Sequence, residues 1–379
     1  MKQALAETSD SDLENRSAMN RVHASLAWAC VALGISCGTT EERPVVVLTL
    51  MVVDSIGSYD GPCSFGSVTD ACILSNGNIV ILDESTVSIY LASEDGELLA
   101  GRNAAGSAPG EFQGLKRAYP DEGGGVWVLA ESMERKTVLF DDTLALVREV
   151  VFQDQSLGFP STFRHLTGDT FAGLFLVYSH IDSTTQAVQI FSNDGSPPLC
   201  LRQHSVPYNP VIQGPGFIYT TGDGGVVFVA RAKASAFLVE KFDPEGNLIG
   251  VISLPEAFPE PKPAWLIQQQ VDHIQRMFLQ STGSPPDFPI IVQETFNMMD
   301  YMGVDADQRL WVLRGNYLEP VFDVFGPNGT REFVCTVKLP EWQECDRWRF
   351  HVGRGGFLAF PENPDLFPVV YRMELAATE

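Results

Sequence analysis

Charged side chains follow several short apolar segments, at the points where predicted strands end. Five of them could face one another, namely Asp83, Glu84, Glu131, Arg231 and Arg314. Acids come from the earlier segments and bases from the later ones, so together they could hold a polar ligand through charged hydrogen bonds. Scattered charges also commonly form a solvated rim. Both interpretations stay open, and we treat the five as a candidate ligand-binding rim.

Motifs for catalysis are not recognisable in the chain. A metal-dependent hydrolase would need carboxylates converging on a hard cation such as Ca²⁺. Aspartates are plentiful, but many lie in turns such as residues 93–97, where an Asp side chain bonds local backbone. The histidines are isolated from one another, and no GxSxG nucleophile elbow occurs. We therefore assign no catalytic residue, metal ligand or cofactor, and Ca²⁺ is expected only if the protein is such an enzyme.

The cysteines allow two interpretations. Cys63 and Cys72 are near each other in sequence, as are Cys335 and Cys345. Each pair could form a disulfide if the chain is exported to an oxidising compartment. Buried free thiols are equally consistent with the sequence. No spacing typical of a zinc site occurs.

The N-terminal region resembles a bacterial lipoprotein signal. A short basic segment after Met19 precedes an apolar run over 24–35, which is too short for a stable membrane-spanning helix. The run ends just before Cys37, the expected lipidation site, although Gly34 stands where such signals usually have Leu. The segment over 1–18 is then a spurious or disordered extension, and 38–44 is a tether. The alternative is a plain cleaved signal with a chance Cys.

A pattern of Gly-rich turn, strand, loop, strand and second turn returns six times. The copies cover residues 75–99, 121–152, 167–199, 222–255, 305–340 and 353–375. Repeats of roughly 40–50 residues, each with four short strands, are typical of β-propeller blades. The sixth copy lacks its last strand, and the segment 45–54 is a strand without a repeat of its own. We therefore predict one six-bladed propeller over 45–375, closed by this N-terminal strand, with a tail at 376–379.

Several turn and strand segments resemble NHL-like six-bladed β-propeller proteins. They are DGELL, GSAPGEF, FDPEGNLIG, VDADQRLWVL and FGPNGTREF. The resemblance covers roughly residues 45–375 and implies the fold. Many exported bacterial members are lipoproteins, and others in the wider superfamily are lactonases, lyases or binding modules, so the fold does not decide the function.

An insertion over 256–296 separates the fourth and fifth repeats. It opens with a Pro-rich run, and residues 264–281 then carry apolar side chains at helical spacing. Because this helix connects an outer strand to the next inner strand, we expect it to cap one mouth of the central channel. The alternative is that it covers an exposed blade edge.

The charge of the chain limits its partners. The formal net charge is -23, which repels phosphate backbones and anionic membrane surfaces. We expect no nucleic-acid partner, membrane attachment only through the lipid anchor, and a monomer. The favoured function is an extracytoplasmic binding or scaffold module, in the periplasm or cell envelope, which holds an unknown protein or small polar ligand on the capped face. The alternative is a metal-dependent hydrolase or lyase of the same fold.

Overall fold

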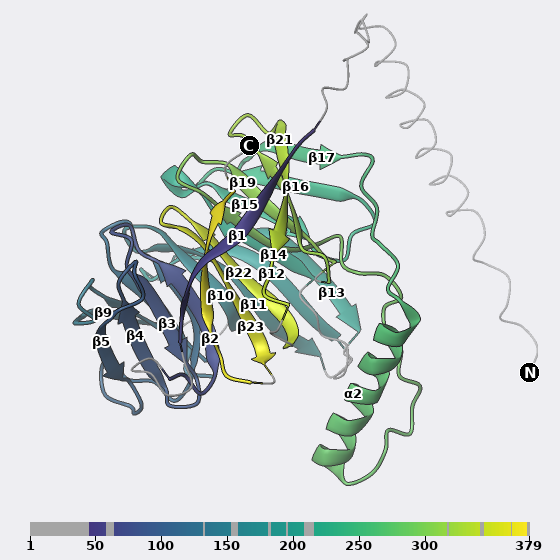
Figure 1. The fold of residues 1–379 in the computed structure, drawn as a ribbon, viewed down its shortest axis with the longest axis horizontal. Helices are drawn as coiled ribbons and strands as arrows, with labels where there is room; N and C mark the ends of the chain where they lie inside the picture. Colours follow the sequence, from purple (N-terminus) through teal and green to yellow (C-terminus); the bar gives the residue numbers. More distant parts are fainter. Residues whose placement is uncertain are drawn as a thin grey trace, which may run out of the picture. The chain divides into compact units, whose positions relative to one another are not determined.

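A computed structural model describes residues 45–57, 64–131, 133–152, 158–180, 183–194, 196–207, 216–316, 318–341, 345–364 and 366–376. These residues form an all-β fold of antiparallel sheets, as predicted (Figure 1). Within Val45–Glu379 these residues make up one compact unit. The predicted signal, Cys37 and the tether lie outside the described residues.

Four sheets have four strands each, and in each sheet the strands neighbour one another in chain order. The first is β2 (Val68–Ile73), β3 (Ile79–Asp83), β4 (Ser88–Ala92) and β5 (Leu98–Asn103). The second is β6 (Leu115–Pro120), β7 (Val126–Ala130), β8 (Lys136–Phe140) and β9 (Leu146–Val151). The third is β10 (Phe159–Thr167), β11 (Thr170–His180), β12 (Ser183–Ser192) and β13 (Leu199–Pro207). The fourth is β14 (Phe217–Thr221), β15 (Val227–Arg231), β16 (Phe237–Phe242) and β17 (Leu248–Leu254), with a short 3₁₀ turn η2 (Asp223–Gly225) after β14.

The fifth sheet has eight strands and closes the ring. Its order is β18 (Met299–Val304), β19 (Leu310–Arg314), β20 (Val321–Phe325), β21 (Arg331–Lys338), β1 (Val46–Ile56), β24 (Val370–Leu375), β23 (Gly356–Pro364) and β22 (Cys345–Gly353). The N-terminal strand β1 pairs in parallel with β21 and antiparallel with β24, so it supplies the strand that the last repeat lacks.

The prediction of six four-stranded blades is therefore confirmed only in part: the structure has four such sheets and one of eight strands. The chain forms five hydrogen-bonded sheets, because β1 has partners along both of its edges. Its first half, Val46–Met51, follows β21, and its second half, Leu50–Ile56, follows β24. An 11-residue strand is long enough to serve both neighbours, so the last two repeats merge into one sheet.

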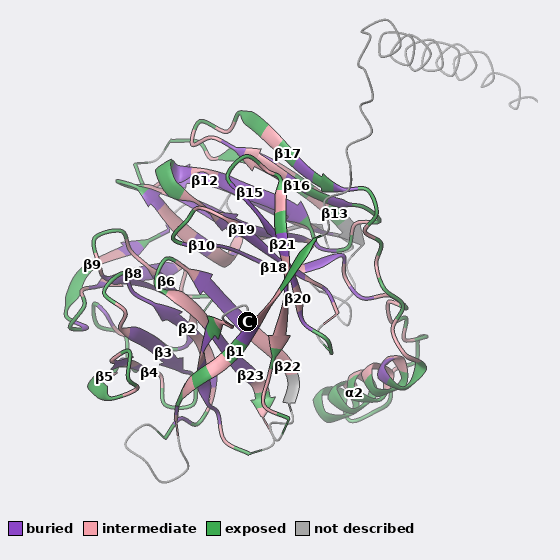
Figure 2. Cartoon of the chain, turned by 45° about the horizontal axis from the view of Figure 1, so that its top comes forward, coloured by how far each residue is buried: buried purple, intermediate pink, exposed green. Residues whose placement is uncertain are grey.

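The sheets are arranged as a ring, because the first strand of each repeat lies against the neighbouring repeats. Contacts link β2 to β6, β7 to β10, β10 to β14, β14 to β18, β18 to β22, and β22 back to β2. The hydrophobic core lies between successive sheets: one cluster joins the first and second sheets, and another joins the fourth and fifth. Figure 2 shows the strands of the ring mostly buried. This arrangement is a β-propeller.

The second and fifth repeats each contain the same kind of side-chain contact, which fixes the turn after the first strand. Asp121 Oδ1 accepts a hydrogen bond from Trp127 Nε1 at 2.8 Å, and Asp305 Oδ2 accepts one from Trp311 Nε1 at 2.8 Å. The same aspartates accept backbone N–H groups two residues further on, as Asx turns do. The turn residues that recur in the sequence therefore make the same hydrogen bonds in these two repeats.

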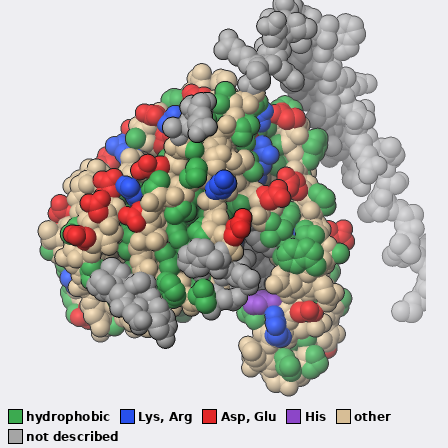
Figure 3. All heavy atoms as spheres, viewed as in Figure 1, with side chains coloured by type: hydrophobic (Ala, Val, Ile, Leu, Met, Phe, Trp, Pro, Cys, Tyr) green, Lys and Arg blue, Asp and Glu red, His purple; other side chains and the backbone are tan. Residues whose placement is uncertain are grey.

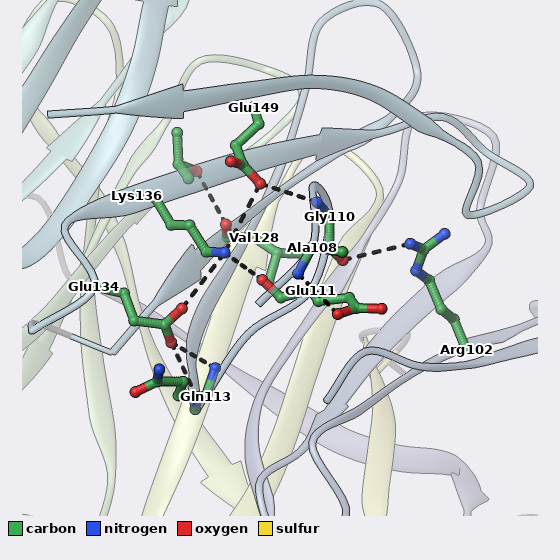
Figure 4. Close-up of polar contacts among 11 residues, drawn as sticks. Arg102, Ala108, Gly110, Glu111, Gln113, Val128, Glu134, Lys136 and Glu149 are labelled. Atoms are coloured by element: carbon green, nitrogen blue, oxygen red, sulfur yellow. Dashed lines mark hydrogen bonds and ion pairs between the residues drawn. The ribbon is translucent and has the colours of Figure 1, made fainter. Parts of the chain in front are cut away.

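The GSAPGEF segment, residues 106–112, is held in place by a buried lysine. Lys136 Nζ bonds the backbone oxygen of Glu111 and lies 3.5 Å from Glu134 Oε2 and 3.8 Å from Glu149 Oε2 (Figure 4). Glu149 in turn accepts the N–H of Gly110 at 2.9 Å. Lys136 also lies over the ring of Phe112, 5.2 Å from its centroid. The motif therefore has a structural role, fixing the connection between the first and second sheets.

The insertion contains the predicted helix, α2 (Ala264–Thr282), which ends at Gly283 in the left-handed conformation. Leu266 is its one buried residue, and Figure 2 shows the rest of the helix mostly exposed. No residue of 256–296 lines the cavity described below, so the structure does not show the expected cap. The part of the chain that the structure describes contains no helix long and apolar enough to cross a membrane.

Candidate functional site

A cavity of about 350 Å³ lies at the centre of the ring. Its wall includes residues from the first strand of every repeat, so it is the central channel of the propeller. Six aromatic residues contribute to it: Tyr119, Phe217, Tyr219, Tyr301, Trp348 and Phe350. Small-molecule sites are typically concave, largely apolar and within the 300–1,000 Å³ range, with a few polar groups that fix the ligand.

The charged side chains of the cavity are mostly cationic. They are Asp70, Arg117, Arg164, Asp300, Arg347 and Arg349. The formal net charge of the whole chain is -23, and Figure 3 shows acidic side chains more widely spread than basic ones on the visible face. The cavity therefore reverses the charge balance of the surface. A clustered cationic channel in an acidic protein focuses the local field on an anion.

Two of the four arginines already have carboxylate partners. Arg347 lies 3.6 Å from Asp300 Oδ2. Arg349 pairs with Glu362 and also donates to the backbone oxygen of Thr69 at 3.2 Å. These arginines bind the inner strand of the last repeat to neighbouring parts of the ring, and their charge is largely neutralised.

Arg164 lies near the axis of the ring. Burial raises the pKa of Cys72, Tyr119, Tyr219 and Tyr301 and lowers that of His351, and in each case the charge of Arg164 acts in the lowering direction; these groups lie on all five of the other first strands. A single cation can act on all of these strands only from a central position, because Coulomb interactions weaken with distance. The guanidinium carbon lies 4.8 Å from the centroid of the Tyr119 ring, a cation–π contact.

Neither Arg164 nor Arg117 has a carboxylate partner among the residues that the structure describes. Arg117 Nη1 donates to the backbone oxygen of Lys116 at 3.1 Å. Its charge opposes the burial that raises the pKa of the Asp70 carboxyl, and Asp70 Oδ2 accepts the N–H of Ala118 at 2.9 Å. The cavity thus holds two cations that the protein itself does not neutralise through an ion pair.

His351 adds an unpaired polar atom to the cavity wall. The residue is 6% exposed, and its Nε2 has no hydrogen-bond partner. Burial lowers its pKa to about 3, and the charge of Arg164 contributes in the same direction. The imidazole is therefore neutral at pH 7 and offers one ring nitrogen for a hydrogen bond that the protein does not make.

The tyrosines of the cavity are neutral and locally anchored. Tyr301 accepts the N–H of Val352 at 2.8 Å, which joins β18 to β22. These strands also meet at Gly303, where an added Cβ would lie 2.6 Å from the backbone oxygen of Val352. Tyr219 donates its hydroxyl to the oxygen of Ala172 at 3.1 Å. Burial raises the pKa of Tyr219 and Tyr301, so both hydroxyls stay protonated at neutral pH.

The acids of the predicted rim lie outside the cavity wall. Asp83 is fully buried at the end of β3 and accepts backbone N–H groups from Gly66, Ser67 and Ser85, so it organises a loop. Glu84 is exposed and accepts the hydroxyl of Thr69 at 3.3 Å. Glu131 is exposed after β7.

The bases of the rim likewise contact other parts of the ring. Arg231, at the end of β15, lies 2.7 Å from His204 Nδ1. Arg314, at the end of β19, forms two hydrogen bonds of 2.9 and 3.0 Å with the buried Asp323. The five residues occupy strand ends of different sheets, as the repeat predicted, and none of them belongs to the cavity wall.

The described cysteines are free. Cys72 on β2 and Cys335 on β21 are free, buried thiols, so neither of the two disulfides considered from the sequence is formed in the structure. Each side chain belongs to the hydrophobic cluster of its own part of the ring. Cys63 and the side chain of Cys345 lie outside the described residues. Within the described ranges, no group of three or more His, Cys, Asp or Glu could hold a metal ion.

The charged residues of the cavity were not among the site residues predicted from the sequence. The predicted residues lie at the ends of strands, whereas the cavity charges lie within them. The signal was a charge in the middle of an otherwise apolar first strand, as in VTDACI for Asp70. The segments FPSTFRHLT and CDRWRFHVG also carry Arg164, Arg347 and Arg349 within first strands, but their other polar residues make the signal weaker there. In a propeller such positions lie beside the channel, and a charge there calls for a functional explanation.

Comparisons with known proteins identify neither a family nor an activity. No family model matches the sequence, and no curated protein matches it. Several solved structures are similar at low identity. One is a candidate exported protein from Bacteroides fragilis, 12% identical with a TM-score of 0.49, covering 87% of this chain and 95% of that one. A member of the DUF4221 family from Bacteroides vulgatus is 10% identical, with a TM-score of 0.47 and coverage of 88% and 98%. Virginiamycin B lyase from Staphylococcus aureus is 10% identical, with a TM-score of 0.39 and coverage of 83% and 82%.

Proposed function

We propose that the protein is a binding module that holds a small polar ligand in the central cavity of a six-bladed propeller. The observation that carries this proposal is the cavity itself, where cationic and aromatic side chains from five of the six first strands converge and the sixth supplies Asp70. An unpaired buried nitrogen on His351 supports it, because buried polar atoms without a partner are rare in folded proteins.

The count of six blades rests on how the eight-stranded sheet divides. Strands β18 to β21 follow chain order like the other sheets, and β22 to β24 are completed by β1. We count these halves as the fifth and sixth blades, which share β1 as an edge strand. Six first strands then surround the cavity, one from each repeat.

The same proposal places the protein outside the cytoplasm, tethered through Cys37. The support is the basic segment, apolar run and Cys over 19–37. Cell fractionation of the full-length chain and of Cys37→Ser tests it. We expect the native chain in the membrane fraction and the variant released in soluble form. Recovery of both in the cytoplasm would overturn the tether.

Ligand binding can be tested with a variant that fills the cavity. Ser161 lines the cavity, whereas Ser253 is an exposed serine on β17. Thermal shifts of the full-length protein are measured against a panel of small carboxylates, phosphates, amines and sugars. We expect at least one compound to stabilise the native protein and Ser253→Trp but not Ser161→Trp. A panel without any stabilising compound, or equal shifts in Ser161→Trp, would overturn the proposal.

A second candidate is a hydrolase or lyase that works in the same cavity. The observation that favours it is Asp70, whose buried carboxyl has a raised pKa, as groups used in acid–base catalysis often do. Turnover of lactone or ester substrates that disappears in Asp70→Asn would establish it. Binding without turnover by the native protein would exclude it for those substrates.

A further inference from the structure

We propose that the ligand of the cavity is a small organic anion whose carboxylate or phosphate group pairs with Arg164 and Arg117. This inference rests on the proposed function and deepens it by naming the class of ligand. The geometry that carries it is the position of Arg164 in the cavity wall, beside the Tyr119 ring and the Tyr301 hydroxyl, with no carboxylate from the described chain beside it.

An unpaired guanidinium in a partly buried cavity is unfavourable for the empty protein. Placing a charge away from water without a partner is costly, because the protein solvates an ion less well than water does. Among the residues that the structure describes, the ring of Tyr119 and a polar contact with Tyr301 offset this cost for Arg164. A bound anion would supply the missing negative charge. Its oxygens would accept hydrogen bonds from the N–H groups of the guanidinium, which lie in one plane.

A cationic ligand fits less well, because the two cavity acids are already engaged. Asp300 accepts Asn297 Nδ2 at 2.6 Å and lies 3.6 Å from Arg347. Asp70 accepts the N–H of Ala118 and lies within the field of Arg117 and Arg349. A cation would have to compete with these partners and would face Arg164 at close range.

The rest of the cavity indicates an apolar body on the anion. Tyr119, Tyr219 and Trp348 supply aromatic walls, and the volume of about 350 Å³ suits a single ring better than a large metabolite. The free Nε2 of His351 can make one further hydrogen bond to a neutral polar group of the ligand. The expected ligand is thus a compact, ring-containing or short-chain carboxylate or phosphate monoester.

Titration calorimetry with four probes tests the inference on the full-length protein. Benzoate and phenyl phosphate carry the two anionic groups, benzylamine carries a cation, and benzyl alcohol carries no charge. We expect at least one anion to bind about tenfold more tightly than the other two probes, since a charged hydrogen bond contributes about 1.4 kcal/mol or more. The ratio between benzoate and phenyl phosphate distinguishes a carboxylate ligand from a phosphate one.

The variant Arg164→Gln tests whether anion binding depends on the cavity, and Arg148→Gln is its matched control. Arg148 lies on β9 and pairs with the exposed Asp169 on the surface. We expect about tenfold weaker anion binding in Arg164→Gln and native binding in Arg148→Gln. Arg117→Gln should weaken the anion in the same direction.

The outcomes separate this inference from the proposed function. If benzylamine or benzyl alcohol binds as tightly as the anions and Ser161→Trp abolishes that binding, the cavity is a ligand site but the anion inference is wrong. If Arg164→Gln binds the anion with native affinity, the inference is also wrong. If none of the four probes binds, the anion inference falls, and the wider ligand panel decides the proposed function separately.

Discussion

Two cations inside this propeller, Lys136 and Arg164, have opposite surroundings. Lys136, in the second sheet, is within 4 Å of two carboxylates, bonds a backbone oxygen and covers an aromatic ring (Figure 4). Arg164, at the axis, has an aromatic ring and tyrosine hydroxyls but no carboxylate among the described residues. The protein therefore neutralises the cation that holds a loop and leaves the cation in its cavity without an ion pair.

The difference separates structural charge from charge available to a ligand. A buried ion pair contributes to a defined structure when both members are present, and it is costly when one is missing. Natural proteins tolerate such unfavourable groups mainly at functional sites. On this argument Lys136 serves folding, and Arg164 is retained for binding.

The largest effect is expected at Lys136. Lys136→Met leaves Glu134 and Glu149 partly buried without their cation, so we expect the free energy of unfolding to fall by about 3 kcal/mol. Urea denaturation measures it. Lys338→Met, at an exposed lysine on β21, is the control and should change stability by less than about 0.5 kcal/mol. If Lys136→Met loses no more stability than the control, Lys136 does not stabilise the fold.

A smaller effect is expected from His351 on acidification. Its folded-state pKa of about 3 lies below the ordinary value of 6.5, so its contribution to stability is present above pH 6.5 and is lost as the pH falls towards 3. Between pH 6.5 and 5 the native protein should lose about 2 kcal/mol more than His351→Gln. Urea denaturation at both values measures the difference. Parallel losses in the two proteins would show that His351 is not held neutral.

Asp70 should show the opposite dependence on pH. Its pKa is raised above the ordinary value of 3.8, chiefly by burial, so the stability it contributes is lost as the pH rises through the folded-state pKa. Asp70→Asn keeps an oxygen for the N–H of Ala118 and removes the charge. We expect it to be more stable than the native protein at pH 7 and equally stable at pH 3, as measured by thermal unfolding. A destabilised variant at pH 7 would show that the cavity needs this carboxylate.

The smallest loss of stability is expected when Arg164 is replaced, and this substitution tests the comparison with Lys136 most directly. Arg164→Gln removes an unpaired cation and breaks no ion pair, so the free energy of unfolding should stay the same or rise, and it should not fall by more than about 1 kcal/mol. Urea denaturation beside Lys136→Met provides the measurement. A loss as large as that of Lys136→Met would mean that Arg164 supports the fold, and its role in the cavity would have to be reconsidered.

Much of the architecture could be predicted from local sequence. The short apolar runs in segments such as 79–83 and 126–130 and the turns between them determine the strands, because each strand buries its side chains against neighbouring sheets. The return of that pattern, with Asp121 and Asp305 at equivalent turns, determined the ring. The unpaired strand at 45–54 predicted closure, and the helical spacing after Pro263 predicted α2.

Other features depend on tertiary contacts. The pairing of β1 with β21 as well as β24 merges two repeats, and no pattern within β1 shows that it has two partners. Cys72 and Cys335 are free thiols buried in the hydrophobic core, whereas their spacing from Cys63 and Cys345 in the chain also allowed disulfides.

The site shows the same division. The sequence by itself determined that strands of this kind recur and that a channel must lie between them. It also contained every charge of the cavity, but only ring closure brings residues more than two hundred positions apart, such as Asp70 and Arg349, to one wall. Which arginines find carboxylates and which stay unpaired is decided there, because an ion pair depends on distances in space, and neighbours along the chain do not report those distances.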